Sequence, residues 1–508
     1  MDYERCAHLH NELLRRGCLA SGQVWPDSPP QTWWEHYSPI DEETAVKLGP
    51  FLIGFLKRAY VRSNNAKWGN FFYYIHGLCD PNEMLCDETL TNTWDQYFKI
   101  ENGRFVRLYG TTWWKDDEEY GLVFDRETSK ATLISYFFEL RDMLKTKYCW
   151  LPLETILAGY LEMIDEGKVV GVPDSKAVHA QLQFESVTLD NGWKPPLPEP
   201  IQPWIMNLYT PIDVEKATSA LERLLDAIDS RIDGIRRRPG STAALASAPY
   251  ANLLWSGPAM FRADLIPEKT FAFDFLKAVA RLRVRFRYLA PGIRFMTPEE
   301  FLGQSTKASH PGGHCLRIFQ VEPLSDDDDD VSDEEDESDS DGDKEEEEEE
   351  REEEEEEENN NHQKAIDPIP PNSTTDRFPE RTRPGFYIQQ VHPNDYHHFA
   401  NECRLELPFS IGANSWARQS SGEPFGWDLF TWYPKPKDKT SELYQSGSQT
   451  GFTDLRRVQI HKVLNNWAER IEAGDWLVNE DGVMGGIGKF RQADTERHWE
   501  KYWIPLSW

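Results

Sequence analysis

The chain has 508 residues, of which 39% are hydrophobic and 28% charged, and its formal net charge at pH 7 is −32. This length predicts two to four globular domains with room for at least one large core. The densest apolar run, residues 49–56, is far shorter than the ~20 residues of a membrane-spanning helix. The first residues carry acids where a targeting peptide carries bases, so a soluble intracellular protein is expected.

The negative charge is concentrated in one part of the chain. Residues 326–358, called the acidic segment below, contain 26 acidic and 2 basic residues, a net charge of −24. The other 475 residues carry 61 acidic and 53 basic residues, net −8, which is ordinary for a globular surface. Because the body has no strongly basic region, direct binding of nucleic acid is not expected.

The cysteines do not indicate a disulfide framework. There are seven, an odd number, and no two have the C-x-x-C spacing. Reduced and buried thiols are therefore the favoured interpretation.

The first half of the chain favours helices. Gly49-Pro50 interrupts an apolar pattern and should kink a helix, and Gly167 is a C-cap candidate. We predict a mainly α-helical domain over residues 1–238, followed by a linker over residues 239–250. Helical spacing of apolar residues marks four segments: 44–60, 131–144, 153–164 and 213–235.

A second domain is predicted to begin after the linker. Residues 281–288 alternate arginine with apolar side chains, which favours a strand with the arginines on one face. Residues 298–302 are typical of a short helix with Thr297 as its N-cap. Residues 315–321 and 386–391 have the composition of strands, and we expect these two strands to be neighbours.

The acidic segment and its Pro- and Asn-rich continuation fall between these two strands. We interpret residues 324–383 as a disordered acidic insertion in an α+β, Trp-rich domain formed by residues 251–323 and 384–508. Long loops cost little closure entropy, and a run of like charges cannot pack a core. The predicted fold class is α+β: a mainly helical N-terminal domain, then an α+β domain whose antiparallel sheet is interrupted by a disordered acidic loop.

The C-terminal stretch is rich in tryptophan, with 8 of the chain's 19 after residue 400. Residues 409–412 and 427–432 are predicted strands, and Leu464 to Ile471 is a predicted helix that ends at Gly474. The apolar C-terminus is expected to pack into a core.

This stretch resembles a known family over about 100 of the 508 residues. The similarity is to the second half of SUKH-type domains, a family that includes the fungal cell-wall assembly regulators. The resemblance implies an α+β module that binds proteins without catalysis, and its fungal members carry long acidic disordered segments. The residues that carry it are Phe409-Ser410-Ile411-Gly412, Trp427-Asp428-Leu429-Phe430 and the run from Val463 to Trp476.

The sequence contains one metal-like cluster, formed by His310, His314 and Cys315. The spacing of the two histidines could direct both imidazoles at one Zn²⁺. Pro311-Gly312-Gly313 argues against the helix that this needs, so a loop leading into a strand is favoured. The Gly-rich residues 483–490 lack the first Gly and the final Ser or Thr of a phosphate-binding loop. Neither a metal nor a cofactor is predicted.

Candidate interaction residues follow from charge and aromatic character. The four arginines between residues 281 and 287 could bind the acidic segment or a phosphorylated ligand, or could pair with carboxylates of their own domain. Four serines of the acidic region precede acids, the pattern that acidophilic kinases recognise. The candidates for partner binding are Arg281, Arg283, Arg285, Arg287, Trp427 and Trp432, and those for phosphorylation are Ser325, Ser332, Ser338 and Ser340.

The leading functional hypothesis is a non-catalytic intracellular scaffold or regulator that binds other proteins, some of them basic. Its acidic arm would tune partner binding. Residence in the cytoplasm, the nucleus or both is expected. Two alternatives stay open: an acidic chaperone for basic proteins such as histones, and an enzyme whose site is assembled from separate loops. Residues for such a site would be Asp116, Asp117, His310, His314 and Asp428.

Overall fold

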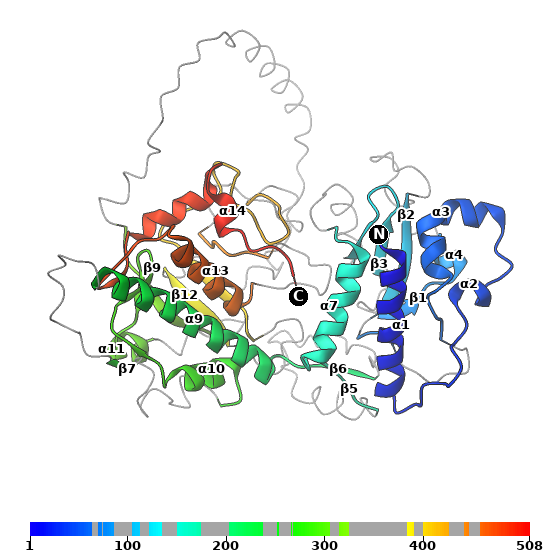
Figure 1. Cartoon of the computed structure of the whole chain (residues 1–508), viewed down its shortest axis with the longest axis horizontal. Helices are drawn as coiled ribbons and strands as arrows, with labels where there is room; N and C mark the ends of the chain where they lie inside the picture. The colour runs from blue at the N-terminus through cyan, green and yellow to red at the C-terminus, as the bar shows by residue number, and fades with distance from the viewer. Residues whose placement is uncertain are drawn as a thin grey trace, which may run out of the picture.

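The computed structural model describes residues 1–62, 70–73, 75–85, 104–111, 121–134, 150–173, 203–236, 251–252, 266, 268–304, 314–324, 384–390, 400–425, 441–446 and 458–507. These residues form two hydrophobic cores, in two lobes that lie side by side (Figure 1). The first core runs in sequence from Cys6 to Trp204, and the second from Ala217 to Ile504.

The first lobe combines helices with antiparallel strands. The described elements of this lobe are α1 (Tyr3–Ala20), α2 (Trp33–His36), α3 (Glu42–Leu56), β1 (Ile75–Leu78), α4 (Pro81–Met84), β2 (Phe105–Thr111), β3 (Gly121–Asp125), β4 (Lys130–Ile134), α7 (Leu153–Asp165), β5 (Val169–Gly171) and β6 (Trp204–Met206). Strands β1 to β4 form one sheet in sequential order, and β5 pairs with β6. Helix α1 packs against α7 and α3.

A buried histidine lies in the core of this lobe. The His10 ring is stacked on Phe71, with 4.8 Å between ring centroids. Its Nε2 donates to the Tyr60 carbonyl at 2.8 Å, so the neutral ring accepts at Nδ1 from the Tyr109 hydroxyl at 2.9 Å. Burial lowers the pKa of His10 from 6.5 to about 4, which keeps the ring neutral near pH 7.

The second lobe is built on a seven-stranded sheet. The described elements of this lobe are α9 (Pro211–Arg236), β7 (Ala251–Asn252), α10 (Phe271–Val279), β8 (Arg283–Val284), β9 (Tyr288–Ala290), β10 (Ile293–Phe295), α11 (Pro298–Leu302), β11 (His314–Val321), β12 (Gly385–Gln390), β13 (Cys403–Glu406), α13 (Ile460–Ala473), β14 (Val478–Asn479), β15 (Gly482–Val483), the 3₁₀ helix η6 (Ile487–Asp494) and α14 (Trp499–Tyr502). The strand order in the sheet is β13-β12-β11-β10-β9-β15-β14.

Helix α13 joins the helices of this lobe to its sheet. It packs along α9 (Figure 1). Its fully buried Trp467 meets Phe386 of β12 edge to face, with 5.3 Å between ring centroids. The Trp467 indole N–H donates to the Tyr444 hydroxyl at 2.9 Å. Helix α13 ends at Gly474, whose φ of +83° places it in the left-handed conformation that favours glycine.

The sequence predictions for fold class and for several elements are confirmed. The chain is α+β, and the helical stripes at 153–164, 213–235 and 464–471 are helices α7, α9 and α13. Helix α3 is kinked at Gly49, which has φ +75°. Strands β11 and β12 are antiparallel neighbours, as expected from their sequences.

Other predictions need correction. The first lobe contains a four-stranded sheet that the mainly helical prediction omits, and residues 131–134 of the predicted helix 131–144 belong to strand β4. Strand β2 is buried along its whole length, so it lacks the alternation that marks a half-buried strand. Residues 135–144 lie outside the described residues. The prediction of reduced, buried thiols, in contrast, is confirmed at Cys6, Cys18, Cys79 and Cys403.

Two predicted strands of the second lobe also differ. Residues 281–288 do not form one strand, because β8 pairs with β7 whereas β9 belongs to the seven-stranded sheet. Residues 409–412 are a loop. The backbone N–H groups of Gly412, Asn414, Trp416 and Ala417 all donate to the buried Asp494 carboxylate at 2.8–3.0 Å, instead of to a neighbouring strand.

The two cores divide the chain before helix α9. The apolar stripe of α9 belongs to the second core, and the chain passes from one core to the other between Trp204 and Ala217. The linker predicted over residues 239–250 lies outside the described residues, as does the insertion predicted over residues 324–383 except for Leu324. The C-terminal prediction is confirmed at Ile504, which is buried, and at Leu506, whose N–H donates to the Ser420 carbonyl.

Candidate functional site: the arginine segment beside helix α9

Along the chain, the predicted arginine face lies between helix α10 and β9 of the seven-stranded sheet. Residues 281–287, called the arginine segment below, place Val284 and Phe286 in the second core, with 8% and 7% of their surface exposed. Arg281, Arg283 and Arg287 are exposed. The alternation expected from the sequence is therefore present in burial except at Arg285, whose side chain is only 8% exposed, and the segment is not a continuous strand.

Carboxylates of helix α9 pair with two of these arginines. Arg281 Nη2 lies 2.8 Å from Glu222 Oε1. Arg285 donates from Nε to Asp229 at 2.7 Å and from Nη2 to Asp233 at 2.6 Å. The Arg285 side chain is only 8% exposed, so its charge is balanced by two acids that are one helical turn apart. These contacts hold the arginine segment against helix α9.

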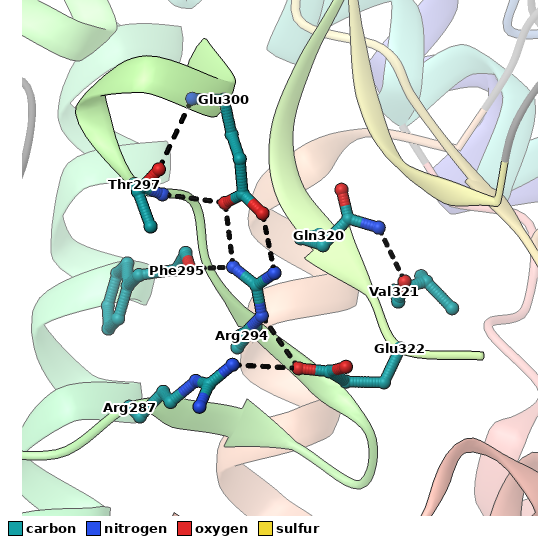
Figure 2. A network of polar contacts seen from close by, with 8 residues as sticks. All are labelled: Arg287, Arg294, Phe295, Thr297, Glu300, Gln320, Val321 and Glu322. Carbon is teal, nitrogen blue, oxygen red and sulfur yellow. Dashed lines mark hydrogen bonds and ion pairs between the residues drawn. The ribbon is translucent and has the colours of Figure 1, made fainter. Parts of the chain in front are cut away.

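A second network links Arg287 to the end of strand β11 (Figure 2). Glu322 accepts from Arg287 Nη2 at 3.1 Å and from Arg294 Nε at 2.6 Å. Arg294 also makes a bidentate contact with Glu300, at 2.7 and 2.8 Å. Figure 2 shows Arg294 between the carboxylates of Glu300 and Glu322, with Arg287 below it and directed at the same oxygen of Glu322.

The start of helix α11 orients Glu300 for this contact. Thr297 accepts from the Glu300 N–H at 3.2 Å, and the Glu300 carboxylate accepts from the Thr297 N–H at 2.8 Å, which forms a capping box. The Arg294 guanidinium lowers the pKa of Glu300 to about 2, and Glu300 in turn raises the pKa of Arg294. Both groups are therefore charged at neutral pH.

The network marks the place from which the acidic region departs. Glu322 directly follows β11, and the region that includes the acidic segment begins at residue 325. Gln320 of β11 pairs with Gly385 of β12, so the two ends of that region are held on neighbouring strands. The arrangement can bind anionic groups: Arg281 and Arg287 keep 70% and 58% of their side chains exposed.

The remaining candidates lie outside the part of the chain that the structure describes. This holds for Trp427, Trp432, Asp116, Asp117, Asp428, His310, Ser325, Ser332, Ser338 and Ser340, and for the side chains of His314 and Cys315. Among the described residues, no group of three or more His, Cys, Asp or Glu side chains could hold a metal ion. Within the same residues, no helix is long and apolar enough to cross a membrane.

Sequence reasoning missed a buried polar cluster between the lobes, formed by Lys168, Asp213 and Asn401. One local signal was present, because Thr210 and Asp213 have the spacing of a helix N-cap and its third residue. A buried lysine such as Lys168 has no local sequence signature. It can be found only once the two lobes are placed together.

Comparisons with protein-family models, with curated proteins and with solved structures give no significant match to this chain. The resemblance to SUKH-type domains therefore stays a prediction. The functional argument depends on the residues of the chain itself.

Proposed function

We propose that this protein is a non-catalytic interaction scaffold whose acidic segment binds basic segments of partner proteins. The observation that carries the proposal is the position of the acidic segment. A net charge of −24 over residues 326–358 is inserted between β11 and β12, two paired strands inside a seven-stranded sheet.

The way this region is anchored supports the proposal. The strands on either side of it, β11 and β12, are paired in one sheet, so the acidic segment is tethered to the second lobe at two neighbouring points. A dense negative charge attracts basic partners over a range set by the Debye length, about 8 Å at physiological salt. Phosphorylation of Ser325, Ser332, Ser338 or Ser340 would add about −1.5 to −2 charges each and strengthen the attraction.

The rigidity of the anchor also supports it. The Arg294 network and the core contacts of β11 and β12 fix the exit point of the acidic region. Because Arg285 and Arg294 are already paired with carboxylates of the second lobe, their charge is largely used within the fold. These two arginines therefore do not compete with an external basic partner for the acidic segment.

Affinity purification from native cells with mass spectrometry tests the proposal. The bait is the full chain, compared with a variant of equal length in which the acids of residues 326–358 become Gln or Asn. We expect the neutral variant to lose a defined set of basic partners. An Arg281→Gln and Arg283→Gln variant is the matched control and should keep them. An unchanged partner set with the neutral variant would contradict the proposal.

A further inference from the structure

A buried ion pair joins the two lobes. Lys168 follows helix α7 in the first lobe, and Asp213 lies in the first turn of α9 in the second. Lys168 Nζ is 2.5 Å from Asp213 Oδ2, and the two side chains are 1% and 2% exposed. Lys168 adjoins Val169 of the first core, and Asp213 adjoins Val214, which packs against the second core, so the pair lies where the two cores meet.

Asp213 also binds a third, distant segment. Asn401 Nδ2, 1% exposed and next to β13, donates to Asp213 Oδ1 at 2.8 Å. Oδ2 accepts in addition from the Thr210 N–H at 2.7 Å. We call Lys168, Asp213 and Asn401 the junction cluster. It connects the end of α7, the beginning of α9 and the approach to β13.

The backbone around the cluster is held in the same way. Asn207 donates from its N–H to the Lys168 carbonyl at 2.7 Å and from Nδ2 to the Gly167 carbonyl at 2.8 Å. The Leu208 carbonyl accepts from Lys168 Nζ at 3.3 Å and from the Ala400 N–H at 2.9 Å. Asn207 and Leu208, which connect the two lobes, are therefore together hydrogen-bonded to residues of both lobes.

A buried ion pair is a weak source of net stability, because removing two charges from water offsets most of their attraction. Its best-attested use is to specify one arrangement among several, since any arrangement that separates the partners leaves a buried charge unpaired. Each lobe here has its own core, so the arrangement in question is that of one lobe against the other.

We propose that the junction cluster fixes the orientation of the two lobes, as a conformational device separate from the stability of either core. Neutralising the cluster leaves both cores folded and lets the lobes adopt other orientations. A partner that contacts both lobes would then meet a variable surface in place of one fixed surface.

The test measures the distance between the lobes by pulsed electron spin resonance on the full chain. Nitroxide labels are attached through a genetically encoded keto amino acid at Glu43 of α3 and Glu299 of α11, both exposed. The variant combines Lys168→Met with Asp213→Asn, which removes both charges and keeps an acceptor for the Thr210 N–H. We expect its distance distribution to broaden or shift, with circular dichroism unchanged.

A second inter-lobe ion pair supplies the control. Lys216 of α9 contacts Glu166 at the end of α7, but these side chains are 34% and 15% exposed. Lys216→Met with Glu166→Gln should leave the distance distribution as in the wild type. A wild-type distribution in the Lys168/Asp213 variant would overturn the proposal, including when its melting temperature falls, because the cluster would then serve stability alone. A broad distribution in the unmodified chain would also overturn it.

Discussion

Asp494→Asn is expected to destabilise the second lobe far more than one surface ion pair would. Asp494 is 5% exposed, and its two oxygens accept four backbone N–H groups from residues 412–417. Asparagine keeps the shape but replaces one oxygen by an NH₂ group, so one buried and one partly buried N–H group lose their acceptor. A buried donor left without a partner costs about 1–3 kcal/mol and a partly buried one less, which predicts a loss of about 3 kcal/mol.

Urea unfolding followed by circular dichroism measures this loss, and hydrogen exchange shows where it acts. The urea midpoint should fall, whereas the dependence of the unfolding free energy on urea concentration should stay the same. Hydrogen exchange should accelerate at the amides of residues 412–417. Asp475→Asn is the matched control, because Asp475 pairs with Lys501 and Arg470 at a partly exposed position and should cost about 1 kcal/mol or less. A loss as small for Asp494→Asn, with unchanged exchange in the loop, would refute the reasoning.

Two further predictions concern the cores. Unfolded His10 binds a proton below pH 6.5 and folded His10 only below about 4, so the free energy of unfolding should fall by about 3 kcal/mol as pH drops across this window. His10→Gln should remove that pH dependence of the melting temperature, whereas His8→Gln, at an exposed position, should keep it. Melting temperatures of the two variants that changed equally with pH would contradict the assignment. Gly292→Ala should destabilise the protein more than Gly474→Ala. Both glycines have positive φ, but a Cβ at residue 292 would lie 2.4 Å from the Ile487 backbone nitrogen. Equal urea midpoints of the two variants would disprove this.

Local patterns were enough to predict the elements whose burial is one-sided. Helices α7, α9 and α13 each show an apolar stripe at helical spacing, and the capping box at Thr297 is visible in four consecutive residues. The pairing of β11 with β12 could also be predicted, because two strand-like segments flank a stretch too charged to pack.

The elements that were missed depend on contacts between distant residues. Strands β2 and β3 are buried on both faces, so their sequences do not alternate and cannot be distinguished from buried helix. Residues 409–412 have strand propensity, but the Gly412 N–H donates to Asp494, 82 residues further along the chain, instead of to a neighbouring strand. The sequence pattern predicted the burial of Val284 and Phe286 in the arginine segment, whereas the carboxylates on α9 that pair with its arginines lie 52–59 residues away in sequence.

The central claim is that the acidic segment binds basic protein segments, and fluorescence anisotropy tests it most directly. A labelled Lys- and Arg-rich peptide is titrated with the full chain and with the neutral variant of residues 326–358, at about 50 and about 200 mM salt. The account predicts binding by the full chain that weakens about tenfold or more with salt, and little binding by the neutral variant. Equal affinity of the two chains, or binding unaffected by salt, would contradict it.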